Sequence, residues 1–103
     1  MSRPQPALTA EAHTDVWLAV QHYNTQAPLL GLEFLDEFEQ TLSLIHEAPL
    51  LFTLVESPIR RALVHRFPYG VFYLPGSEVV PDVVVAVVEL HQHPDVIRRA
   101  YRR

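Results

Sequence analysis

Apolar residues recur at every third or fourth position through the first half of the chain, the spacing of amphipathic α-helices. This pattern predicts one helix over residues 10–25, with Thr9 as its N-cap and Trp17 widening its apolar stripe, and a second helix over residues 28–46. The stripes are Ala12, Val16, Ala19, Val20 and Tyr23 in the first helix, and Leu32, Leu35, Phe38, Leu42 and Ile45 in the second. A short break containing Pro28 joins them, so we expect an αα-hairpin.

The second half of the chain has the patterns of β-strands. Residues 59–66 alternate between two faces, residues 67–70 (Phe-Pro-Tyr-Gly) are typical of a turn that uses a positive φ at Gly70, and residues 71–74 return as a second strand. The apolar run at residues 83–90 lacks alternation, which indicates a central strand covered on both faces. Residues 95–103 form a basic tail compatible with a helix.

These elements predict a single α+β domain over residues 1–103. In it, an N-terminal α-hairpin packs on a three- to four-stranded antiparallel sheet, and a short helical tail follows. The apolar fraction of 49% is ordinary, and no apolar stretch is long enough to cross a membrane. The chain has no cysteine, and residues 1–8 lack the pattern of a secretory signal, so we expect a cytoplasmic protein without disulfides.

Charge is distributed unevenly along the chain. Residues 1–51 carry one Arg and seven acidic residues (−6), whereas residues 52–103 carry seven Arg and five acidic residues (+2), which gives the net charge of −4. Every basic residue is Arg. Because the guanidinium group stays charged and presents a planar fork, it suits phosphate and carboxylate partners.

Two groups of arginines make a candidate anion site, for a phosphate backbone or for the carboxylates of an acidic peptide. They are Arg60, Arg61 and Arg66 near the predicted turn, and Arg98, Arg99, Arg102 and Arg103 on the tail. The alternative is solvated arginines, some of them paired with the acidic second helix. Tyr69 and Tyr73 flank the turn, where they either contact a base or phosphate or pack in the core.

Three histidines, His65, His91 and His93, are weak candidates for a metal site because no cysteine or regularly spaced carboxylate accompanies them. Proton transfer and a half-buried structural role are the other interpretations. With three glycines and no Gly-rich phosphate loop, a nucleotide-binding turn is not expected. We therefore expect neither a metal nor a cofactor.

A series of short segments in order covers nearly the whole chain. They are residues 8–15, Tyr23, residues 27–31, residues 34–37, Ile45, Pro49, residues 59–61, 66–69 and 71–73, and a final strand ending at His91 and Pro94. Together they resemble the RelE/ParE superfamily of toxins from bacterial type II toxin–antitoxin pairs, whose ParE branch includes plasmid stabilisation proteins. The Arg-Phe-Pro-Tyr turn is the most specific landmark. Two departures are the short Gln92-His93 link and the long connection at residues 75–82.

The resemblance implies a β-α-α-β-β-β fold and two classes of target. ParE-like members bind and poison DNA gyrase without catalysis, whereas RelE-like members cleave mRNA in the ribosome. In a RelE-like site, Arg61, Arg66 and Arg98 would supply charge, and Tyr73, His65 or His91 would transfer protons. RelE-like sites also use lysines, which this acidic chain lacks, so the ParE-like interpretation is favoured and enzymatic activity is left open. A third interpretation is a degenerate, non-toxic binding module of the same fold.

The resemblance also implies a cognate antitoxin as partner. A segment of it that is disordered when free is expected to fold onto a groove and the sheet edge of the toxin. The surface predicted to bind antitoxin or target consists of Arg60, Arg61, Arg66, Tyr69, Tyr73, Arg98 and Arg99.

Overall fold

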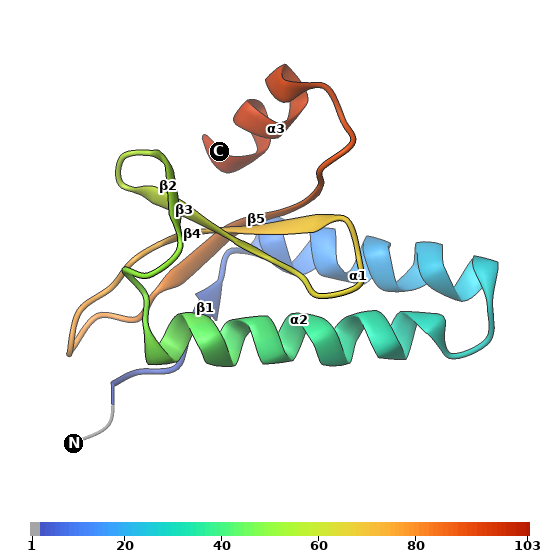
Figure 1. Cartoon of the computed structure of the whole chain (residues 1–103), viewed down its shortest axis with the longest axis horizontal. Coiled ribbons are helices and arrows are strands. Elements are labelled where there is room, and N and C mark those ends of the chain that lie inside the picture. The colour runs from blue at the N-terminus through green and yellow to red at the C-terminus, as the bar shows by residue number, and fades with distance from the viewer. Residues whose placement is uncertain (1–2) are drawn as a thin grey trace.

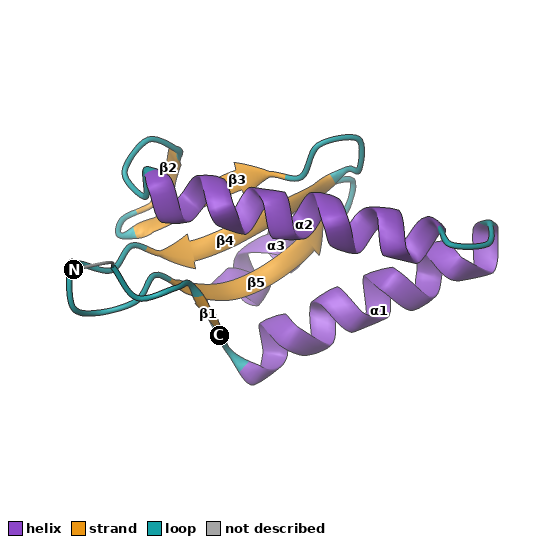
Figure 2. Cartoon of the chain, turned by 90° about the horizontal axis from the view of Figure 1, so that it is seen from below, coloured by secondary structure: helices purple, strands orange, loops and turns teal. Residues whose placement is uncertain are grey.

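A computed structural model describes residues 3–103 and shows a twisted sheet with helices on both faces (Figure 1). The helices are α1 (Ala10–Gln26), α2 (Leu30–Glu47) and α3 (Pro94–Tyr101), and the strands are β1 (Ala7–Leu8), β2 (Thr53–Glu56), β3 (Ile59–Leu63), β4 (Tyr69–Leu74) and β5 (Val83–Glu89). The strand order is β1-β5-β4-β3-β2, with β1 parallel to β5 and the other neighbours antiparallel. Figure 2 shows α1 and α2 together on one face and α3 behind the sheet. In residues 3–103, no helix has the length and apolar character needed to span a membrane.

Helix α1 confirms the predicted stripe, all of whose residues are buried. Thr9 is the N-cap, since its hydroxyl oxygen accepts a hydrogen bond of 3.1 Å from the Ala12 amide. Trp17 does not widen the buried stripe as predicted, because 58% of this residue is exposed. It lies one residue beyond Val16, which rotates it about 100° around the helix, out of the interface.

Helix α2 begins at Leu30 instead of Pro28, and most of its predicted stripe faces the core. Phe38 and Ile45 are buried, and Leu35 and Leu42 are partly buried against the core. Leu32 is exposed instead, whereas Phe34 is fully buried. Helices α1 and α2 come close together at Gly31, where a Cβ atom would overlap the Val20 carbonyl oxygen and where the amide donates a hydrogen bond of 2.8 Å to the Asn24 side chain. The absence of a side chain at Gly31 therefore permits this close approach.

The sheet has five strands, not the three or four predicted. Strand β2 lies in a segment that the sequence indicated as a loop, and β1 contributes two residues beside β5. The turn differs as well, because Tyr69 already belongs to β4. Arg66, with φ of 72°, adopts the left-handed conformation, and Gly70 does not. Strands this short carry too few alternating positions to be recognised from sequence.

Strand β5 is central and covered on both faces, as predicted. A β-bulge shifts its register between the pairs Phe72–Ala86 and Tyr73–Val84, leaving Val85 as the extra residue. Val84 and Val87 pack toward α1 and α2, whereas Val85 and Ala86 both pack toward α3. The run shows no alternation in sequence because both of its faces are covered and therefore apolar. On the α3 side, the Tyr101 ring stacks on Phe72 with centroids 5.1 Å apart.

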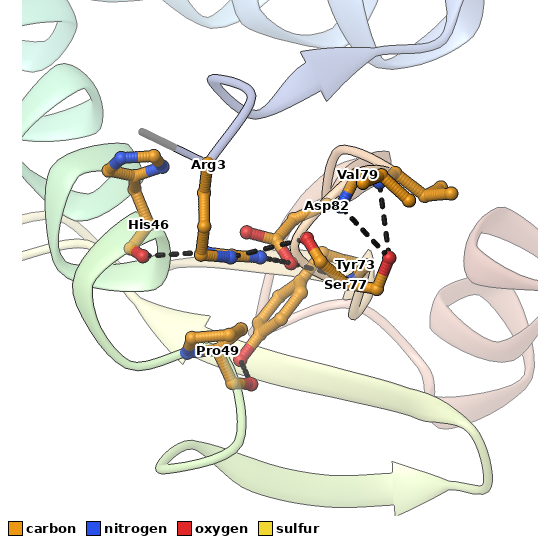
Figure 3. A network of polar contacts seen from close by, with 9 residues as sticks. Arg3, His46, Pro49, Tyr73, Ser77, Val79 and Asp82 are labelled. Atoms are coloured by element: carbon orange, nitrogen blue, oxygen red, sulfur yellow. Dashed lines mark hydrogen bonds and ion pairs between the residues drawn. The ribbon is translucent and has the colours of Figure 1, made fainter. Parts of the chain in front are cut away.

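The long connection between β4 and β5 is held by Arg3 and the buried Asp82 (Figure 3). Arg3 donates hydrogen bonds to the His46 carbonyl oxygen (2.7 Å), to Asp82 Oδ1 (3.0 Å) and to the Ser77 carbonyl oxygen (3.3 Å). Asp82 Oδ1 also accepts from the Gly76 amide at 2.7 Å. The N-terminal arm, the end of α2 and this connection are thereby fixed to one another.

We predict that Arg3→Ala lowers the free energy of unfolding by about 3 kcal/mol, because it leaves the Asp82 carboxylate buried without its cation. Denaturant unfolding of the variant measures this loss. Arg99→Ala, which alters an exposed residue, is the control and should change stability by no more than about 0.5 kcal/mol. Adding Asp82→Asn to Arg3→Ala should recover part of the loss, since the charge is then removed. Equal stability of Arg3→Ala and Arg99→Ala would contradict this assignment.

Candidate functional site

The predicted cations of β3 point to opposite faces of the sheet. Arg60 pairs in register with Tyr73, which belongs to the core under α1 and α2, whereas Arg61 pairs with Phe72, which belongs to the core under α3. Arg60 donates a hydrogen bond of 2.8 Å to the Phe52 carbonyl oxygen. Arg66 also lies with the helix layer, where it pairs with Glu33 at 3.0 Å. The three arginines around the turn therefore do not form one cluster.

Beneath α3, the structure brings Arg61 and Arg98 together in one open cavity of about 270 Å³. The remaining wall is mostly apolar and aromatic, and consists of Val55, Phe72, Leu90, Pro94, Ile97 and Tyr101. Among residues 3–103, no group accepts a hydrogen bond from the buried Nε atom of Arg61. Because buried polar groups are normally paired, the unpaired Nε of Arg61, together with the Arg98 guanidinium in the same cavity, indicates a place where an anionic group can bind.

The arginines of the tail have two kinds of surroundings. One of them lines this cavity, and others form ion pairs that hold α3 against the rest of the protein. Arg102 donates to both carboxylate oxygens of Glu56, at 2.9 and 2.8 Å. Arg103 likewise donates to both oxygens of Asp15, at 2.8 and 3.1 Å. The hydrogen bond from Arg102 holds the pKa of the Glu56 carboxyl below its usual value. Arg98, which lines the cavity, is partly buried and bonds to Asp95, whereas Arg99 is exposed and is not among the residues that line the cavity.

The side chains proposed for RelE-like proton transfer are not gathered around this cavity. Tyr73 is fully buried on the helix side, and its hydroxyl donates a hydrogen bond of 2.6 Å to the Pro49 carbonyl oxygen. Burial raises the pKa of Tyr73 to about 12, so the phenol stays protonated near neutral pH. His65 bonds to Glu37 at 2.8 Å, also on the helix side. Of the RelE-like set, only Arg61 and Arg98 line the same cavity.

The link between β5 and α3 uses its histidines for local structure. His91 pairs with Glu89 at 2.8 Å. The His93 side chain accepts a hydrogen bond of 3.0 Å from the Asp95 amide and so caps the start of α3. Within residues 3–103, no three His, Cys, Asp or Glu side chains converge as they would around a metal ion. This cap could not be recognised from the residue pattern, because His is an uncommon N-cap residue.

Tyr69 is buried among aromatic side chains, with its ring centroid 5.0 Å from that of Phe34. Tyr69 also lines a separate cavity of about 390 Å³ between α1, β5 and α3, and Glu89 is another residue of its wall. Burial raises the pKa of Tyr69 to about 12. Tyr69 and Tyr73 thus pack in the core, in agreement with the second of the two interpretations of these residues. Sequence reasoning missed Tyr101, although its spacing of four from Ile97 on the tail indicates a shared helix face.

Comparison with known proteins identifies the fold. No family model and no curated protein matches the sequence. Among solved structures, a chain described as the chromosomal ParDE TA (toxin–antitoxin) system from P. aeruginosa is similar, with a TM-score of 0.72 and 15% identity over 87% of this chain and 96% of that chain. At this identity the similarity concerns the fold, and it confirms the architecture that the sequence resemblance implied. The protein therefore has the ParE/RelE-like toxin fold.

Proposed function

We propose that the protein is the toxin of a type II toxin–antitoxin system, of the ParE-like kind. It inhibits bacterial growth by binding a macromolecular target in the cytoplasm, with DNA gyrase favoured, and a cognate antitoxin neutralises it. The fold shared with a ParDE chain supports membership of a toxin–antitoxin system. The observation that favours binding over catalysis is the cavity under α3, which holds two guanidinium groups but none of the predicted proton-transfer side chains.

Cleavage of RNA by its own 2′-hydroxyl requires a proton acceptor, a proton donor and cations around one phosphate. Around the cavity, the remaining hydroxyl is that of Tyr101, whose pKa is raised by burial and by a hydrogen bond with Glu56. A cavity with two cations and aromatic side chains but no general base is suited to binding a carboxylate or phosphate, and less suited to catalysing a reaction at a phosphate. RelE-like mRNA cleavage is the alternative that the experiments below test.

The same cavity supports the proposed contact with an acidic antitoxin segment. Arg61 and Arg98 line it, and Arg99 is an exposed cation on α3. Arg66 is a further proposed contact, since its pair with Glu33 is about half exposed and can exchange partners. Arg60 is instead held by a backbone carbonyl on the other face of β3.

Induced expression in a bacterium tests the class of function, because either kind of toxin arrests growth and a degenerate module does not. Purified protein should then inhibit gyrase supercoiling and leave translated mRNA intact. Ribosome-dependent mRNA cleavage with normal gyrase activity would instead establish the RelE-like alternative. Growth arrest with neither effect would overturn both targets.

Substitution of the two arginines in the cavity under α3 by alanine should weaken the complex with the antitoxin. For Arg61→Ala combined with Arg98→Ala, we expect about a tenfold rise in Kd and a shallower salt dependence, because two cations leave the interface. Calorimetric titration at several salt concentrations, with the product of a neighbouring short reading frame as antitoxin, measures both. Arg60→Ala is the matched control on the opposite face. An unchanged Kd and salt slope for the double variant would remove the cavity from the interface.

Tyr73→Phe separates a structural from a catalytic role of this residue. It should cost about 1 kcal/mol of stability through loss of the bond to Pro49, and growth arrest should persist. The folded-state pKa of about 12 exceeds the unfolded value near 10, so neutral Tyr73 contributes stability that is complete below pH 10 and lost between pH 10 and 12. Denaturation at stepped alkaline pH should therefore show a smaller decline for Tyr73→Phe. Loss of toxicity in a folded variant would speak for catalysis.

A further inference from the structure

The outer edge of strand β5 is paired along only part of its length. Strand β1 ends at the pair Leu8–Val84, so from Val85 to Glu89 no strand within residues 3–103 lies on this side of β5. The cavity of about 390 Å³ that Tyr69 lines opens along this unpaired stretch, between α1 and α3, and we call it the edge cavity. Its wall combines charged, polar and apolar groups, as binding sites commonly do.

One end of the edge cavity already holds a guanidinium group of the protein itself. Asp15 accepts a hydrogen bond of 3.0 Å from the Val87 amide, and Arg103 donates from both terminal nitrogens to the Asp15 carboxylate. Arg103 also donates to the Val85 carbonyl oxygen, at 3.5 Å. A carboxylate beside a strand-edge carbonyl is therefore the arrangement with which this edge binds a cation.

The other end of the cavity offers acceptors of the same kinds. Glu89 pairs in register with Tyr69, so both side chains share the face toward the helical hairpin. Because the N–H and C=O of one residue point to the same side of a strand, the Val87 carbonyl oxygen lies at the outer edge with its amide. Burial raises the pKa of Tyr69 to about 12, so its phenol stays neutral. Arg103 is the single arginine among the described residues that line the cavity, and it is bound to Asp15.

Glu89 keeps the capacity to accept from a further donor. The His91 amide and the His91 ring both bind its Oε1 atom, at 3.0 and 2.8 Å, so Oε2 can accept from a ligand. The His91 side chain is 81% exposed, and a contact so close to water is readily replaced.

The shape of the cavity favours a long cation over a compact one. Apolar side chains form most of the wall, namely Leu18, Ala19, Val87, Val88, Val96 and Ala100. They suit the aliphatic stem of an arginine, while Glu89, Tyr69 and Gln92 can accept from its head. A guanidinium presents five donors in a planar fork, which matches acceptors on several elements better than an ammonium does.

Exposed apolar surface beside the cavity indicates a protein as the source of this cation. Leu18 lines the cavity and is 57% exposed, and the adjacent Trp17 is 58% exposed. A small molecule inside the cavity leaves most of this surface in water, whereas a polypeptide that inserts one side chain covers it.

We propose that the edge cavity binds an arginine side chain of another protein, with its stem between α1 and α3 and its guanidinium on Glu89 and the Val87 carbonyl oxygen. Helix α3 then separates two cavities of opposite preference, since the one under α3 holds Arg61 and Arg98. This site does not depend on the proposed toxin function.

NMR titration of isotope-labelled protein tests the chemistry of the site. Acetyl-arginine amide should shift the amide signals of Val87, Glu89 and Gln92 in a saturable way, and acetyl-citrulline amide, its uncharged isostere, should not. Glu89→Gln should raise the Kd at least about tenfold. Glu47→Gln removes the same charge from an exposed position on α2 and should leave the Kd unchanged. Equal shifts with both amides, no saturation, or equal Kd values for the two variants would overturn the proposal.

A second titration distinguishes a protein side chain from a free small cation. The peptide Ala-Leu-Arg-Leu-Ala should bind at least about tenfold more tightly than agmatine, because its leucines cover Leu18 and Trp17. Leu18→Ser should remove this advantage and leave agmatine binding unchanged. Leu44→Ser, at a leucine of α2 that is 53% exposed, is the matched control and should retain it. Equal affinity for peptide and agmatine would indicate a site for a free cation and exclude the protein partner.

Discussion

The antiparallel pair of β4 and β5 lies at the centre of the sheet and is apolar on both faces, so the chain must cover it twice. The α1–α2 hairpin covers one face and α3 covers the other. A bulge at Val85 directs two successive residues, Val85 and Ala86, toward α3, and the alternation of faces resumes beyond it. A helix of eight residues can cover its side since Tyr101 stacks on Phe72 and the arginines at its end bind Glu56 and Asp15.

The long elements could be predicted from sequence because each carries several turns or positions of a regular pattern. Helix α1 and strand β5 are examples, and the basic tail proved to be α3. What the pattern could not give was the burial of Phe34 in place of Leu32, or the close contact of Gly31 with the backbone of α1. Strand β1 was expected only from the family resemblance, and β2 was expected to be a loop, because two to four residues are too few to define a period.

The candidate site was predicted in part. Composition indicated that arginines form the candidate anion site, and the alternation of residues along the strand already placed Arg60 and Arg61 on opposite faces. It could not indicate which face gains a cavity, because that depends on where α3 packs. The pair of Arg66 with Glu33 agrees with the alternative in which some arginines pair with the acidic second helix, whereas the contact of Arg103 with Asp15, 88 residues away in the chain, could not be predicted. Arg61 and Arg98 thus share the cavity under α3, whereas Arg102 and Arg103, which bind Glu56 and Asp15, line a different one.

Trp17, the single tryptophan of the chain, is mostly in water on α1 although it lies beside a buried stripe. An indole that is already hydrated emits at nearly the wavelength it has in the denatured chain. Intrinsic fluorescence is therefore a poor reporter of unfolding for this protein. The same exposure makes the indole a sensitive reporter of any macromolecule that covers the outer surface of the helical layer, without the need for an added dye.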